Sequence, residues 1–173
     1  MDYITEFLKL LVPAALVMYA MYLVMRNFLQ KQFDHRLLDI KIKNNETVLP
    51  IRLQAYERIA LLLERISPNN MLLRLSDPST SAFAFQQLLL NEIREEFNHN
   101  LSQQVYMSDL AWAKIRTTVN EIVTAVQESA QKMDESKNAI DLAEAIFDYM
   151  SKLDRDPVGE ALTLVKEETR QLF

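Results

Sequence analysis

One pair of side chains in the sequence has the spacing of a metal-binding unit. Glu96 and His99 stand three residues apart, and a Glu and a His at this spacing on a bundle helix form one ligand unit of a di-iron carboxylate site. Such a site needs a second unit of the same kind and two further inward carboxylates. The only other histidine, His35, has Gln32 three residues before it, so the second unit is missing. We therefore predict no bound metal and no other cofactor.

Nucleophilic catalysis has no better support in the sequence. The chain has no cysteine, which removes thiolate chemistry, and seven of its nine serines lie in predicted helix caps and breakers, where hydroxyl capping accounts for them. Neither histidine has a neighbouring serine in a pattern that suggests a catalytic triad. A single glycine in 173 residues also removes Gly-rich phosphate loops and nucleophile elbows. We predict that the protein is not an enzyme and takes no small-molecule substrate.

Two polar-rich segments, 52–70 and 97–106, carry more polar side chains than folding of their helices requires. Within residues 98–104, every side chain except Leu101 is polar and none is a carboxylate. A solvated helix face and a hydrogen-bond network that faces a partner explain this run equally well. A core position is the simpler interpretation of Trp112, with a partner contact as its alternative. The candidate interaction residues are Arg52, Gln54, Tyr56, Arg58, Asn69, Asn70, His99, Asn100, Gln103, Gln104 and Trp112.

The element that leads into these segments begins with an apolar stretch. Leu10 to Met25 are uncharged without interruption, and with Lys9 snorkelling the stretch reaches back to Ile4. At ~1.5 Å per residue this is about 33 Å of helix, enough for a hydrocarbon core of ~30 Å. Apolar residues surround the helix on all sides, as lipid requires. The predicted membrane span includes Leu10, Pro13, Leu16, Tyr19, Tyr22 and Met25.

A cleaved signal peptide and a buried core helix are the alternatives to this span. The acidic start and the absence of a small-residue cleavage site disfavour the signal peptide. The flanking charges then orient the span, because residues 1–25 carry a net charge of −1 and residues 26–43 a net charge of +3. Basic flanks stay on the cytoplasmic side. We expect a single-pass protein of the inner (cytoplasmic) membrane, with its N-terminus out and its C-terminal domain in the cytoplasm.

Composition predicts an all-α chain, in which a single N-terminal transmembrane helix precedes a small antiparallel helical-bundle domain. One glycine, five prolines and abundant Leu, Ala, Glu and Gln favour helices throughout. We place the anchor and juxtamembrane helix at 1–45 and the cytoplasmic all-helical domain at 46–173. Residues 67–173 carry a net charge of −7, which disfavours nucleic-acid binding.

The expected helix boundaries follow from caps and breakers. We expect breaks at 44–50, 67–70 and 77–81, with Thr47 capping the helix that follows the first of them. Residues 38–53 favour a helix, with a short hairpin as the alternative because residues 38–43 alternate with period two. Apolar residues at every fourth position predict a long helix over 80–106, and 3-4 spacing after Ser108 predicts a second helix antiparallel to it. Further helices are expected around 140–153 and from Asp156-Pro157 onward.

Three segments resemble an uncharacterised bacterial family of single-span, membrane-anchored helical proteins. They are Leu-Pro-Ile-Arg-Leu-Gln-Ala-Tyr-Glu-Arg at 49–58, Leu-Glu-Arg-Ile-Ser-Pro-Asn-Asn at 63–70, and Phe-Asn-His-Asn-Leu-Ser-Gln-Gln-Val-Tyr at 97–106, with Trp112. The resemblance covers most of the chain. It implies the architecture alone and carries over no catalytic residue.

These observations favour a membrane-tethered helical interaction or scaffold protein, a subunit or adaptor of a bacterial inner-membrane assembly. Its expected partners are the lipid bilayer and either another protein or a second copy of itself. A stator-like strut of the ATP-synthase b-subunit kind is the first alternative. A strut requires one long uninterrupted helix, which the expected breaks argue against. A carboxylate/His metal protein is the second alternative.

Overall fold

The computed structural model describes residues 2–172, and it describes the side chains of residues 15–33, 35–36, 43 and 46–172. The chain divides into two units, Met1–Val48 and Leu49–Phe173. Regular structure in the described residues is helical, apart from one isolated antiparallel bridge between Ser81 and Asn138. The predicted all-α class is confirmed.

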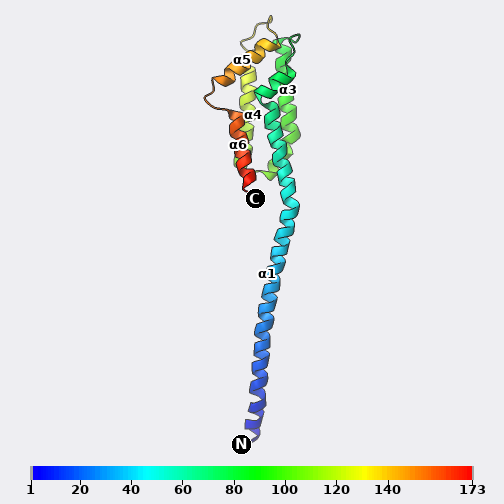
Figure 1. Cartoon of the computed structure of the whole chain (residues 1–173), viewed down its shortest axis with the longest axis vertical. Coiled ribbons are helices and arrows are strands. Elements are labelled where there is room, and N and C mark those ends of the chain that lie inside the picture. The colour runs from blue at the N-terminus through cyan, green and yellow to red at the C-terminus, as the bar shows by residue number, and fades with distance from the viewer. Residues whose placement is uncertain (1, 173) are drawn as a thin grey trace. The chain divides into compact units, whose positions relative to one another are not determined.

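Helices follow one another along the chain with short connections (Figure 1). The α-helices are α1 (Asp2–Ile66), α2 (Pro68–Leu75), α3 (Ala82–Asn100), α4 (Asp109–Ala130), α5 (Ala139–Ser151) and α6 (Pro157–Arg170), and a 3-10 helix η1 (Leu101–Tyr106) joins α3 to α4.

The unit Met1–Val48 contains the first part of α1, and its described apolar side chains are exposed. Leu16, Tyr19, Tyr22 and Met25 of the predicted span all belong to this exposed set. The side chains of Leu10 and Pro13 lie outside the described residues. Within the part of the chain that the structure describes, no helix combines the length and the apolar character that a bilayer crossing requires. The predicted span therefore stays a prediction.

The predicted break at 44–50 is wrong, because α1 is helical without interruption from Asp2 to Ile66. Thr47 does not act as a cap. Its hydroxyl donates to the carbonyl of Lys43, 3.1 Å away, which is the bond a threonine makes to the preceding turn inside a helix. Pro50 also lies within the helix, although it cannot donate to the helical ladder. Residues 38–53 are accordingly helical, as favoured, and the hairpin alternative is excluded.

The core of the unit Leu49–Phe173 lies between the end of α1 and the helices α2 to α6. The helices α3 and α4 run side by side in opposite directions, α5 packs against both, and α6 packs against α4 (Figure 1). Apolar residues at 3-4 spacing supply the buried faces, as amphipathic helices do. The largest fully buried side chains are Phe85, Ile59, Leu62, Leu63, Ile66, Met71, Leu72, Leu89, Ile93, Ile115, Ile122 and Leu142.

Side-chain caps set most helix starts, at the residues that the sequence indicates. Ser67, Ser81 and Ser108 accept the backbone N–H groups of Asn70, Ala84 and Ala111, respectively, at the N-termini of α2, α3 and α4. Asp156 caps α6, whose first residue is Pro157. Each cap satisfies an N–H that has no partner within its helix.

The predicted helix over 80–106 ends earlier than the apolar pattern suggests. The α-helical part stops at Asn100, and Leu101–Tyr106 continue as the 3-10 helix η1. A 3-10 helix has about three residues per turn, so residues spaced by four no longer share a face. Leu101 and Val105 are consequently exposed, although they continue the spacing of Phe85, Leu89 and Ile93.

Candidate functional site

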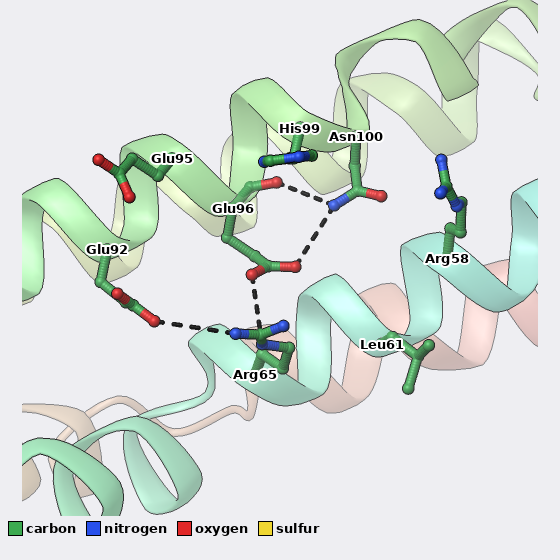
Figure 2. Close-up of a pocket in the computed structure, with 8 residues that line it drawn as sticks. All are labelled: Arg58, Leu61, Arg65, Glu92, Glu95, Glu96, His99 and Asn100. Atoms are coloured by element: carbon green, nitrogen blue, oxygen red, sulfur yellow. Dashed lines mark hydrogen bonds and ion pairs between the residues drawn. The ribbon is translucent and has the colours of Figure 1, made fainter.

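An open hollow of about 540 Å³ lies between the last turns of α1 and the C-terminal half of α3. Figure 2 shows the side chains that line it. Arg58, Leu61 and Arg65 come from α1, and Glu92, Glu95, Glu96, His99 and Asn100 come from α3. The α1 edge is therefore basic and the α3 edge is acidic.

A second open hollow of about 490 Å³ lies between α1 and η1. It is lined by Ile51, Gln54, Ala55 and Arg58 of α1 and by Ser102, Gln103, Val105 and Tyr106 of η1. Because Arg58 lines both hollows, the two form one surface, which we name the polar groove. Apolar side chains on this surface are few, with Ile51, Leu61 and Val105 the exposed ones.

Ion pairs hold the α2 end of the polar groove. The guanidinium of Arg65 lies 3.2 Å from the Glu96 carboxylate and 3.9 Å from that of Glu92. Arg74 of α2 also reaches Glu92, at 2.9 Å. These pairs are partly exposed, and pairs of this kind contribute about 0–1 kcal/mol each to stability. They fix the positions of the charges more than they stabilise the fold.

Two charged side chains on the groove lack such a partner. Among the described residues, neither Arg58 nor Glu95 forms an ion pair, whereas Glu95 accepts a hydrogen bond from the Asn91 amide at 2.9 Å. Figure 2 shows the side chain of Asn100 on the side of α3 that faces Arg58, and its amide donates to the carbonyl of Glu96 at 2.9 Å. Because this amide is uncharged, it does not serve as a counter-ion for Arg58. Arg58 and Glu95 are consequently available to charged groups outside the domain.

A hydrogen-bond network braces η1 against α1 and α6. The hydroxyl of Tyr56, a residue only 2% exposed, donates to Oε1 of Glu168 at 2.7 Å and accepts a bond from Arg52 at 3.2 Å. The other side of the Glu168 carboxylate binds Ser108, which donates its backbone N–H at 2.8 Å and its hydroxyl at 2.7 Å. The carbonyl of Tyr106 lies 3.2 Å from the Tyr56 hydroxyl. This network holds the segment that forms one wall of the polar groove.

The surroundings of the network shift the pKa values of its two central groups. Burial raises the pKa of Tyr56, and the bond to the Glu168 carboxylate adds to this effect because it favours the neutral phenol. Burial also acts to raise the pKa of Glu168. The bonds that Tyr56 and Ser108 donate to the carboxylate, together with the charge of Arg52, outweigh it and lower that pKa. At neutral pH the network therefore consists of a carboxylate and a protonated phenol.

Comparison with known proteins assigns the chain to a family. A model of a family of unknown function, DUF7935, matches residues 2–172. The chain belongs to this family. Its description gives no activity, so it assigns a role to none of the groove residues, and it confirms the resemblance to an uncharacterised family. No curated protein and no solved structure matches the chain.

The structure of this DUF7935 member gathers part of the predicted interaction set on one surface. Gln54, Arg58, His99, Asn100 and Gln103 line the polar groove, although 52–70 and 97–106 are distant in sequence. The helix α1 supplies the first two and the α3–η1 junction the other three. The two polar-rich segments therefore face one another along this groove.

Other residues of the predicted set lie elsewhere. Arg52 and Tyr56 belong to the bracing network, and Gln104 is exposed outside the groove linings. Asn69 and Asn70 line a separate hollow beside α5 and α6, where Asn70 also bonds the backbone carbonyl of Glu64. Trp112 is partly buried and stacks on Phe97, with ring centres 5.6 Å apart, as its core interpretation suggests.

Four residues of the first hollow are absent from the predicted set, namely Leu61, Arg65, Glu92 and Glu95. Their spacing contains a signal, because Arg58, Leu61 and Arg65 recur every three or four residues on α1, and Glu92, Glu95 and His99 do so on α3. Exposed charges at this spacing are common on ordinary helix faces. The signal becomes specific only when both helices are seen to border one groove.

The Glu96 and His99 pair does not form part of a larger ligand cluster in the described residues. Nowhere in that part of the chain do three His, Cys, Asp or Glu side chains converge so that they could hold a metal ion. The Glu96 carboxylate instead pairs with Arg65, and His99 is exposed at the groove.

Proposed function

We propose that the protein is a membrane-tethered interaction protein whose helical domain offers the polar groove to a protein partner. The observation that carries this proposal is the convergence of two polar-rich segments on one open surface. Folding explains the apolar faces of α1 and α3, but it gives no reason for the exposed, unpaired Arg58 and Glu95 or for the exposed amide of Gln54 on this surface.

The character of the groove favours a protein partner over a small molecule. Small-molecule sites are concave, largely apolar and able to bury most of their ligand. The polar groove is open and lined mainly by charged and amide side chains from two helices. Protein interfaces commonly carry such hydrogen-bonding and charged groups around a few apolar contacts.

The exposed apolar side chains of α1 support the tether. From Leu16 to Met25 the large apolar side chains are exposed on every face of the helix. Contiguous exposed apolar surface of this kind marks contact with lipid or with another protein. The net charge of +3 in residues 26–43 favours a cytoplasmic domain at the inner membrane.

Alkaline carbonate extraction tests the tether. We expect the full-length chain to stay in the membrane pellet. A variant with Leu16→Lys, Met18→Lys and Met21→Lys is expected in the supernatant, because each lysine at the centre of a span costs about 2.5–3.5 kcal/mol. The control variant carries Leu73→Lys, Phe83→Lys and Leu110→Lys, at exposed apolar positions of the domain, and should remain in the pellet. Release of the uncleaved wild-type chain by carbonate would contradict the proposal.

A stator-like strut is the second candidate, and the continuity of α1 favours it. The sequence argued against a strut with expected breaks at 44–50, 67–70 and 77–81. The first is absent, because α1 passes through these residues as a helix, whereas α1 still ends at Ile66 and α2 at Leu75. The interaction role remains the better supported of the two, because a strut does not require the polar groove.

A further inference from the structure

We propose that the polar groove is a self-association surface, on which a second copy of this chain pairs Arg58 with Glu95 reciprocally. This inference deepens the proposed function and rests on it, since it names the partner for the same groove. It follows from three features of the groove: its unpaired charges, their arrangement and the apolar residue beside them.

The unpaired charges are of opposite sign and lie on opposite edges. Arg58 stands on the α1 edge and Glu95 on the α3 edge, and in Figure 2 they lie toward opposite ends of the hollow. The remaining carboxylates between them are already matched, because Arg65 pairs with Glu96 and Glu92, and Arg74 supplies a second cation to Glu92. A partner therefore has one carboxylate and one cation to supply.

A second copy supplies both groups through a twofold axis. In a twofold interface, a residue that contacts a different residue of the partner is contacted by that same residue in return. Arg58 of each copy then meets Glu95 of the other, which gives two equivalent ion pairs. A groove whose unpaired charges had one sign would repel its own copy, so this arrangement is self-complementary.

Leu61 provides the apolar contact between these pairs. It lies one helical turn from Arg58 on α1, lines the same hollow and is 54% exposed. Exposed ion pairs alone are weak, so the association is expected to be modest in solution. A membrane tether raises the effective concentration of the two copies, which makes a modest affinity sufficient.

A charge-swap experiment on the full-length chain tests the pairing. We would measure the self-association constant by sedimentation equilibrium in density-matched detergent. The wild type is expected to form a dimer, and Arg58→Glu and Glu95→Arg are each expected to raise its dissociation constant about tenfold or more. The double variant Arg58→Glu/Glu95→Arg restores both pairs with their charges exchanged, so its dissociation constant should return toward that of the wild type.

The control variant is Arg94→Glu, which changes the charge by the same amount at an exposed α3 residue outside the groove linings. It should leave the dimer intact. Far-ultraviolet circular dichroism, which reports helix content, establishes that each variant is folded. A monomeric wild type, an intact dimer in either single variant, or a folded double variant that stays monomeric would overturn the inference.

These outcomes separate the inference from the proposed function. A monomeric chain that resists carbonate extraction and forms groove adducts with a different protein overturns self-association alone. A chain that carbonate releases from membranes overturns the tether, whatever its state of association.

Discussion

Replacing Phe85 with alanine is expected to lower the free energy of unfolding by about 3–5 kcal/mol. Phe85 is the largest of the fully buried side chains, with 0% exposure, and it lies in the first turns of α3. Its truncation removes buried apolar surface and leaves a cavity in the helical core that the packed helices cannot fill completely. Urea unfolding of the full chain in detergent, followed by the fluorescence of the single Trp112, measures the change.

The chain offers a closely matched control two residues away. Phe83 is 73% exposed on the other face of the same helix, so Phe83→Ala is expected to change the unfolding free energy by less than about 0.5 kcal/mol. Equal effects of the two substitutions would show that the α3 face assigned to the core is wrong.

Replacing Glu168 with glutamine is expected to lower the free energy of unfolding by about 1–3 kcal/mol at neutral pH. The carboxylate accepts bonds from the Tyr56 hydroxyl and from two groups of Ser108. Glutamine keeps one acceptor oxygen but loses the charge, and it places an amide donor where a second acceptor is needed. Urea unfolding followed by the fluorescence of Trp112 measures this change in unfolding free energy as well.

The difference in unfolding free energy between the wild type and Glu168→Gln should decrease as the pH is lowered. Because the folded-state pKa of Glu168 is lower than its unfolded value, its ionisation stabilises the fold above the ordinary pKa of about 4.3. This contribution disappears as the pH falls through the folded-state pKa. The stability difference between the two proteins should therefore shrink as the pH is lowered from about 5 to about 3.

Glu167→Gln provides the control for this second prediction. Glu167 is the exposed neighbour of Glu168, and glutamine there removes the same charge without touching the bracing network. A Glu167→Gln protein that is as destabilised as Glu168→Gln, with the same dependence on pH, would mean that net charge rather than the network causes the effect.

Local signals in the sequence predicted much of the bundle. Ser108 and Asp156 cap helices as expected, and Ser67 and Ser81 cap helices within the predicted breaks at 67–70 and 77–81, because capping depends on a side chain and backbone groups two or three residues away. The buried faces likewise follow from periodicity, as Phe85, Leu89 and Ile93 show. These features are encoded within one or two helical turns.

The errors arise where local signals compete with one another. Asn44, Asn45 and Pro50 together suggest a helix end, yet α1 continues through them, since helix on both sides can override weak local preferences. At the end of α3 the reverse happens, because the helix ends at Asn100 although the apolar spacing favours its continuation. Asn100 turns its amide back onto the carbonyl of Glu96, and the chain tightens into η1 despite favourable apolar spacing.

The candidate site could be predicted only in part. Gln54, Arg58, His99, Asn100 and Gln103 were identified by their polar character, but sequence alone does not show that α1 and α3 border one groove. Glu95 was not predicted as a site residue for the same reason. Its significance depends on the absence of a nearby cation among the described residues, which only the structure reveals.

Site-specific photo-crosslinking in intact cells tests the account most directly. A photoreactive amino acid would replace Gln54 in the polar groove or, as the matched control, the exposed Gln127 of α4, which lies outside the described hollows. We predict a reproducible protein adduct from position 54, recovered in the membrane fraction, and none from position 127. Adducts of equal yield from both positions, no adduct from position 54, or adducts confined to the soluble fraction would contradict a membrane-tethered protein that binds its partner through this groove.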